Sequence, residues 1–231
     1  MFDFKQYNLG ENPQNLVIFL HGYNGNLEDH QYAVDWLNEY LQSAILLTPQ
    51  APEVCDKNPS KRQWFGMLKH DPEYRRINPA VSNEDIFAIY NFAGEQIDAC
   101  AAQINDFITS QQQRLNIDDK NTFLIGFSQG AMLSIYCALS RSSSLGGVFV
   151  LSGLIAGEAK LAQKIHSRPP LYLFHGVNDL KVQYKTLTST VDWLHCHNIE
   201  VQSKIYHDLA HRINEDEIKF IAAKIAESAR K

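Results

Sequence analysis

The sequence G-F-S-Q-G at residues 126–130 places a serine between two glycines. Apolar residues 122–125 precede it and a helix-like stretch, residues 131–139, follows, so Ser128 is expected at a sharp turn from a strand into a helix. Such a turn strains the serine backbone and holds Oγ clear of the sheet, while the glycines let strand and helix pass close together. The pattern predicts that Ser128 acts as a nucleophile.

A serine hydroxyl is a poor nucleophile at neutral pH, so Ser128 needs a base within hydrogen-bond reach and an acid that orients this base. In enzymes with this turn, the acid and then the histidine follow the serine, each on a loop after a later strand. Asp179 comes just after the apolar run 171–174, and His211 follows the run 201–206, directly before the last helical stretch. We therefore predict a triad of Ser128, His211 and Asp179.

Other histidines and carboxylates fit these roles less well. His207 is the strongest rival of His211, but we expect it to belong to the strand still, with less freedom to reach the serine. Asp208 is the corresponding rival of Asp179, and the short loop gives it no separate position from which to orient an imidazole. His175, one residue past an apolar run, is interpreted as a structural residue that braces its loop.

Acyl transfer also needs hydrogen-bond donors for the oxyanion of the tetrahedral intermediate. One candidate is the N–H group of Gln129, at the positive end of the helix that follows the nucleophile. The other comes from the glycine-containing loop at residues 20–25, where we assign the N–H group of Tyr23 by position. The alternative is that residues 20–25 form a plain strand-to-helix turn without an oxyanion donor, because such a turn would carry the same glycines.

The elements that must position these groups alternate along the chain. The alternation predicts an α/β fold with a mostly parallel central sheet, strands buried on both sides and helices on both faces. We expect strands at residues 16–20, 44–47, 122–126, 147–151, 171–174 and 201–206, with a candidate edge strand at 2–9. We expect helices at residues 29–41, 85–113, 129–139, 184–196 and 215–229, with Asn214 as the N-cap of the last.

Between residues 50 and 84 the pattern breaks, because prolines stand among charged and aromatic residues without a sustained period. One interpretation is a loop or lid that covers the site at the strand ends. The other is an ordered surface loop with Trp64, Phe65 and Met67 packed onto the body, and the two do not exclude each other. The whole chain, residues 1–231, fits one domain that contains this irregular region.

Composition excludes several classes of protein. The net charge is −5, from 21 basic and 26 acidic residues, and without a basic run we expect no nucleic-acid partner. The start of the chain lacks a signal-peptide pattern and its longest early apolar run is too short for a bilayer, so we expect a cytoplasmic protein without stable membrane insertion. The histidines and four scattered cysteines lack metal-site spacing, so we expect free thiols, no metal and no cofactor.

Taken in order, these segments resemble the phospholipase/carboxylesterase family of α/β-hydrolases, which includes the acyl-protein thioesterases. The resemblance spans nearly the whole chain, and G-F-S-Q-G is much more specific than G-x-S-x-G. Its other carriers are F-L-H-G at 19–22, the W-F pair at 64–65, H-G at 175–176 with Asp179, and His211. The resemblance implies the α/β-hydrolase fold and the same triad and oxyanion donors that the residues themselves indicate.

The resemblance also implies an acyl-binding groove near the Trp64 loop, so we expect Trp64, Phe65, Leu20 and Gly22 to bind substrate. Some residues depart from the family pattern. Gly66 stands where the family often has Asp after the Trp-Phe pair, and residues 57–76 look longer and more charged than in the family. These departures leave the mouth of the site and the acyl-chain preference open.

We therefore expect a serine hydrolase that cleaves carboxylic esters or thioesters of short to medium acyl chains. Small esters, lysophospholipids and acylated proteins remain open as substrates. The alternative is a non-catalytic ligand-binding protein on the same scaffold, because fold and function separate readily. A peptidase has no sequence feature in its favour, and aromatic residues near the mouth would suit a homodimer or a lid as well as a substrate.

Overall fold

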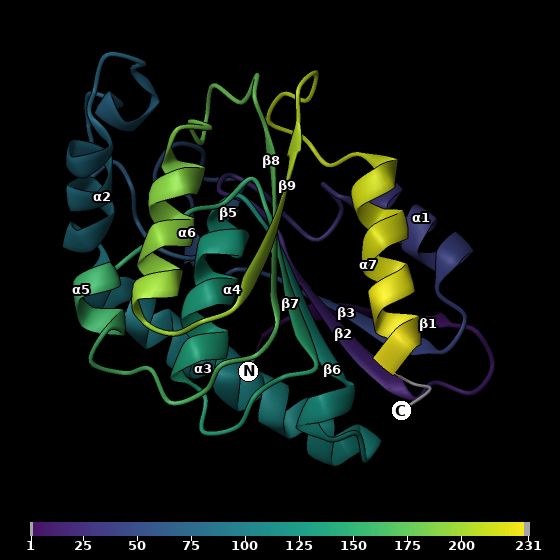
Figure 1. Cartoon of the computed structure of the whole chain (residues 1–231). Coiled ribbons are helices and arrows are strands. Elements are labelled where there is room, and N and C mark those ends of the chain that lie inside the picture. The colour runs from purple at the N-terminus through teal and green to yellow at the C-terminus, as the bar shows by residue number, and fades with distance from the viewer. Residues whose placement is uncertain (1, 229–231) are drawn as a thin grey trace.

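A seven-stranded sheet forms the centre of the computed structural model, which describes residues 2–228 (Figure 1). The strand order is β1-β3-β2-β6-β7-β8-β9; all neighbours pair in parallel except β1, which pairs antiparallel with β3. The strands are β1 Phe4–Leu9, β2 Asn15–Leu20, β3 Ala44–Pro49, β6 Thr122–Phe127, β7 Gly147–Leu151, β8 Leu171–Gly176 and β9 Val201–Tyr206. The expected edge strand and the mostly parallel sheet are confirmed.

Helices cover both faces of this sheet, as the alternation predicts (Figure 1). One face carries α1 Gln31–Tyr40 and α7 Glu215–Ser228, which contact each other. The other carries α3 Gly94–Leu115, α4 Gln129–Ser140 and α6 Thr186–Cys196, with α2 Asn83–Phe92 and the short α5 Glu158–Leu161 outside them. The last expected helix reaches Ser228, and its predicted final residue, 229, lies outside the described residues.

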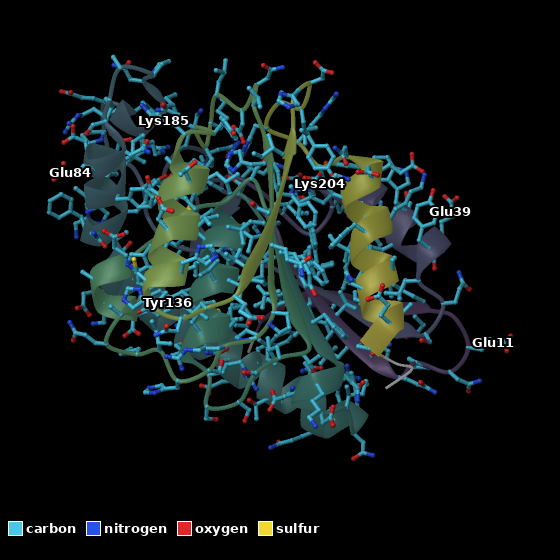
Figure 2. All side chains as sticks on the ribbon, in the orientation of Figure 1. Glu11, Glu39, Glu84, Tyr136, Lys185 and Lys204 are labelled. Atoms are coloured by element: carbon cyan, nitrogen blue, oxygen red, sulfur yellow. The ribbon has the colours of Figure 1, made fainter. Side chains whose placement is uncertain are left out.

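The central strands are apolar because both of their faces are covered. Every residue of β2, β3, β6 and β7 is buried, and their side chains enter two apolar clusters, one on each side of the sheet. The prediction that the strands are buried on both sides is wrong for the two edge strands: β1 exposes Gln6 and Asn8, and most of β9 is exposed. On β9, Lys204 pairs with Asp216 of α7 (Figure 2). A charged side chain on an edge strand opposes pairing with another chain.

The single helix expected at residues 85–113 is two helices, α2 and α3, that meet at Ala93. The apolar period continues across the break because both helices bury side chains in the same cluster. At the start of α2, the Oγ atom of Ser82 accepts the Asp85 N–H group at 3.1 Å, which caps the helix. The last helix, α7, begins with a reciprocal cap between Asn214 and Glu217.

Residues 50–84 are irregular but ordered against the body. They contain the hairpin β4 Glu53–Val54 with β5 Arg62–Gln63 and the 3₁₀ helix η1 Arg75–Ile77. Trp64, Phe65 and Met67 are buried in the core, as the ordered-loop interpretation expects. Lys185, which lies near α2 in Figure 2, donates from Nζ to the carbonyls of Pro79 and Val81 and so ties the end of this segment to α6.

Across residues 2–228, the structure contains no helix that is both long enough and apolar enough to cross a membrane.

Candidate active site

Ser128 lies at the turn between β6 and α4 in a backbone conformation that L-residues rarely adopt, with φ 55° and ψ −117°. Its N–H group donates to the carbonyl of Leu151 at 2.9 Å, which holds the turn against β7. Glycine is required on either side. A Cβ atom at Gly126 would lie 2.3 Å from the carbonyl oxygen of Gly130, and one at Gly130 would lie 2.2 Å from that of Leu20. The predicted strand-turn-helix is therefore present, with the strain at the serine itself.

His211 lies between Ser128 and Asp179. Its Nε2 atom is 3.0 Å from Oγ of Ser128, and its Nδ1 atom is 2.7 Å from Oδ2 of Asp179. The ring packs on Phe127, with ring centroids 4.8 Å apart. Asp179 follows β8 and His211 follows β9, so neighbouring strand ends bring together residues that are far apart in sequence (Figure 1). The structure thus joins the alcohol, imidazole and carboxylate in one hydrogen-bonded series.

The Asp179 side chain is fully buried, and each of its oxygens accepts hydrogen bonds. Oδ1 accepts the N–H groups of Lys181 at 2.8 Å and Val182 at 2.9 Å, while Oδ2 accepts from His211. Burial alone would raise the pKa of this carboxyl, but the bond and charge of His211 and the two N–H groups outweigh it and hold the pKa below its ordinary value. Asp179 is therefore ionised at neutral pH and can stabilise a cationic His211.

The rival residues lie elsewhere. The expectation that His207 belongs to the strand is wrong, because β9 ends at Tyr206; both His207 and Asp208 are exposed. His175 is buried in β8, and its Nε2 atom donates to the carbonyl of Val182 at 2.8 Å. This bond spans the loop that carries Asp179, which fits the bracing role expected for His175.

The two expected oxyanion donors belong to residues of the same cavity. Tyr23 and Gln129 both line the cavity that contains Ser128, and Gln129 is the first residue of α4. The loop that holds Tyr23 is fixed by the buried ring of His21, whose Nε2 accepts the Ala51 N–H group at 3.1 Å while Nδ1 donates to the Gly22 carbonyl at 2.8 Å. These bonds give His21 a structural function. It is excluded as the base because it precedes Ser128, whereas the base of this turn type follows the serine.

A cavity of about 240 Å³ opens at the serine. Its wall combines the predicted residues with others that motif reasoning missed, which come from the Tyr23 loop, the irregular segment, α2, α4 and the Asp179 loop. The additional lining residues are Asn24, Lys57, Met67, Tyr74, Arg76, Ile77, Tyr90, Met132, Lys181 and Val182. For Lys57, Met67, Tyr74 and Arg76, the only sequence signal is the unusual length and charge of residues 57–76.

The four residues expected to bind substrate are not among those that line this cavity. Trp64, Phe65 and Leu20 are fully buried in the core, and the indole N–H group of Trp64 donates to the His21 carbonyl at 2.7 Å. Gly22 lies against the nucleophile, since a Cβ atom there would be 3.3 Å from Cβ of Ser128. Trp64, Phe65 and Leu20 thus belong to the core rather than to the cavity wall.

This arrangement of a nucleophile turn on a mostly parallel sheet, with helices on both faces, defines an α/β-hydrolase fold. Solved structures support the assignment of the fold. Esterase PE8 superimposes with a TM-score of 0.76 at 24% identity, covering 98% of each chain. SOBER1 of Arabidopsis thaliana gives a TM-score of 0.74 at 20% identity, over 93% of this chain and 99% of that chain.

The chain belongs to the phospholipase/carboxylesterase family, whose sequence profile matches residues 7–229. Relatives include the acyl-protein thioesterase 1 of Candida albicans, which is 24% identical over 92% of this chain and 93% of its own length. The carboxylesterase SOBER1 of Arabidopsis thaliana is 23% identical over 90% of this chain and 88% of its own length. The chain is therefore a hydrolase of the carboxylesterase and thioesterase class.

Proposed function

We propose that the chain hydrolyses carboxylic esters or thioesters through an acyl-enzyme formed on Ser128. The observation that carries this proposal is the hydrogen-bonded series from Oγ of Ser128 through His211 to Asp179, with distances of 3.0 Å and 2.7 Å. An alcohol, an imidazole and a buried carboxylate in this order are the parts that nucleophilic acyl transfer requires. The family supplies the class of bond that is cleaved.

In the proposed first step, Oγ of Ser128 attacks the acyl carbonyl while Nε2 of His211 takes the hydroxyl proton. Asp179 accepts from Nδ1 of the imidazolium and stabilises its charge. The carbonyl oxygen becomes an oxyanion that accepts hydrogen bonds from the N–H groups of Gln129 and Tyr23. Collapse of this intermediate expels the alcohol or thiol, which takes the proton from His211.

In the second step, a water molecule attacks the acyl-enzyme and gives its proton to His211. The second tetrahedral intermediate then releases the carboxylic acid as the proton returns to Ser128. No metal or cofactor enters either step, because the histidine moves every proton and the backbone amides stabilise the charge. Among residues 2–228, no cluster of three or more His, Cys, Asp or Glu side chains is placed to hold a metal ion.

The cavity supports a preference for short to medium acyl chains. Its volume is about 240 Å³, and apolar side chains of Met67, Ile77, Met132 and Val182 form part of its wall. A bounded wall of this kind limits the length of chain that can be buried. Small esters, lysophospholipids and acylated proteins all present a suitable carbonyl. Because two relatives are named acyl-protein thioesterase 1, thioesters must be assayed beside oxygen esters.

The test is hydrolysis of 4-nitrophenyl esters and matching thioesters of graded acyl length. Ser128→Ala should lower kcat by roughly 10³-fold or more, because the nucleophile is removed while the fold is kept. Ser142→Ala, at an exposed serine after α4, is the matched control and should keep wild-type turnover. Undiminished hydrolysis by a purified Ser128→Ala protein would refute the proposal.

A fluorophosphonate probe separates the enzyme from a non-catalytic ligand-binding protein on the same scaffold. The distinction matters because one relative, 20% identical over 88% of this chain, is a rice protein named as a probable inactive carboxylesterase. The intact Ser128–His211–Asp179 series favours the enzyme. Labelling at Ser128, absent from Ser128→Ala, supports the proposal, and an unlabelled wild-type protein supports the scaffold.

A further inference from the structure

The wall of the catalytic cavity has a charge opposite to that of the whole chain. Lys57, Arg76 and Lys181 line it, and no aspartate or glutamate does so among the described residues. The chain as a whole has 26 acidic and 21 basic residues. Arg76 is paired with Asp71, but Lys57 and Lys181 have no ion-pair partner among the described residues, and the acyl-transfer chemistry needs none of the three cations.

Arg76 is the most constrained of the three. Its side chain is 10% exposed, and Nη1 donates to Oδ2 of the fully buried Asp71 at 2.7 Å. Its Cζ atom lies 5.3 Å from the ring centroid of Tyr74, and its carbonyl accepts the side-chain amide of Gln183 at 2.7 Å. The guanidinium is therefore held in one place at the cavity wall, without the loss of side-chain freedom on binding that a surface arginine would suffer.

The pair with Asp71 leaves much of this guanidinium unused. Among the described residues, the guanidinium of Arg76 bonds to the Asp71 side chain through Nη1 alone. Arg76 itself is one of the residues that line the cavity. A guanidinium presents its N–H groups as a planar fork that matches the oxygens of a carboxylate or phosphate.

The two lysines lie at more exposed positions of the same wall. Lys57 is on the irregular segment, with Nζ 5.7 Å from the Tyr74 ring centroid. Lys181 is on the triad loop, and its own N–H group donates to Asp179 at 2.8 Å, which fixes its backbone relative to the proposed catalytic carboxylate. Exposed cations around a concave site raise the local concentration of anions and the rate at which they enter.

We propose that the preferred substrates of this hydrolase carry an anionic group, a carboxylate or a phosphate, close enough to the scissile carbonyl for Arg76 to bind it. Lys57 and Lys181 attract the same group towards the cavity. This inference rests on the proposed function and adds to it the class of substrate. A buried Arg76–Asp71 pair that served stability alone would not account for two further cations, Lys57 and Lys181, in the same cavity wall.

The test compares isosteric ester pairs that differ only in charge. Mono-4-nitrophenyl adipate is compared with 4-nitrophenyl adipamate, which places the carboxylate or the carboxamide on the acyl side. 4-Carboxyphenyl acetate against 4-carbamoylphenyl acetate places it on the alcohol side. For wild-type protein, kcat/KM for the anionic member should exceed that for the neutral member by about tenfold or more in one of the pairs, as one charge-assisted hydrogen bond allows. The pair that responds identifies the side on which the anion binds.

Each variant is compared with wild type by the ratio of kcat/KM for the anionic ester to kcat/KM for the neutral ester. The neutral ester shows any loss of activity that is unrelated to charge. Arg76→Gln combined with Asp71→Asn removes both charges without leaving a buried carboxylate unpaired, and it should bring the ratio close to one. Lys57→Gln and Lys181→Gln should each lower the ratio by a smaller factor and weaken its dependence on salt. Arg75→Gln, at the exposed neighbouring arginine that does not line the cavity, is the control and should keep the wild-type ratio.

A wild-type ratio near or below one in both pairs would overturn the inference, and so would a ratio that survives removal of the Arg76 and Asp71 charges. If neutral esters are still hydrolysed in a way that depends on Ser128, the proposed function stands while the anion preference fails. If Ser128→Ala retains full activity, the proposed function itself fails. The two results are therefore distinguishable in one set of assays.

Discussion

The side chain of Gln129 accepts the backbone N–H group of Trp64 at 2.9 Å. The other end of the same amide donates from Nε2 to the carbonyl of Phe65 at 2.7 Å. Because Gln129 directly follows the nucleophile, these two buried bonds connect the irregular segment to the first turn of α4. The residue therefore has two separate parts in the site: its backbone N–H group is the proposed oxyanion donor, and its side chain holds the segment that supplies much of the cavity wall.

Replacing Gln129 with Ala should separate these two parts. The backbone N–H group remains, but the N–H group of Trp64 and the carbonyl of Phe65 lose their partner inside the core, at a cost of about 2–4 kcal/mol in the free energy of unfolding. We expect kcat/KM to fall as the cavity wall loosens, but by much less than in Ser128→Ala. Urea unfolding and ester kinetics measure both effects, and Gln113→Ala, at an exposed position of α3, is the control. Wild-type stability of Gln129→Ala would show that the two bonds contribute nothing.

The contact between Asp179 and His211 gives a second prediction. Asp179→Asn keeps the size of the side chain but removes the negative charge that stabilises the imidazolium and selects the tautomer with a proton on Nδ1. We expect kcat to fall by roughly 10³–10⁴-fold. Asp208→Asn, in the loop before His211, is the matched control and should keep most of the activity. Equal losses in the two variants would contradict the assignment of the acid.

Much of the fold follows from the sequence because local pattern and tertiary environment agree. The strands β2, β6 and β7 are apolar after their first residues, and in the structure both of their faces are covered. The motif at Ser128 and the order of acid and histidine depend on neighbouring strand ends, which a parallel sheet brings together. The three residues expected to form the triad therefore lie in one hydrogen-bonded series.

The cavity wall was not predictable in the same way. Arg76 and Tyr90 reach the wall from an irregular segment and from α2, and no periodic pattern specifies where such residues meet. Trp64 and Phe65 are buried instead, because aromatic side chains in an irregular segment fill the core as readily as they line a pocket. The break at Ala93 was missed because the helices on either side of it share one apolar face.

The ring of His30 makes stability sensitive to acid. It packs between aromatic rings, with its centroid 4.9 Å from that of Phe127 and 5.4 Å from that of Phe19, and burial lowers its pKa from 6.5 to about 4. Between these values the unfolded chain binds a proton that the folded chain does not. The free energy of unfolding therefore falls as pH falls from 6.5 to 4, by up to about 3 kcal/mol from this group.

His30→Leu should remove this contribution and make the free energy of unfolding less dependent on pH over the same window. Urea unfolding at several pH values between 4 and 7 measures it, as the difference between variant and wild type at each pH. His195→Leu, at an exposed position of α6, is the control and should follow the wild-type curve. A difference between His30→Leu and wild type that stays constant with pH would contradict the prediction.

Glu217 should act in the opposite direction. Its carboxyl is buried at the start of α7, where Oε2 accepts the Asn214 N–H group at 2.7 Å, and burial raises its pKa from 4.5 to about 7. As pH rises through this window the unfolded chain loses the proton first, so the free energy of unfolding falls, by up to about 3 kcal/mol. Glu217→Gln stays neutral and keeps an acceptor for Asn214, so it should gain stability over wild type at pH 8 but not at pH 4. Urea unfolding at the two pH values tests this, with Glu84→Gln in the exposed first turn of α2 as the control, and an equal effect at both would show that ionisation of Glu217 is not the cause.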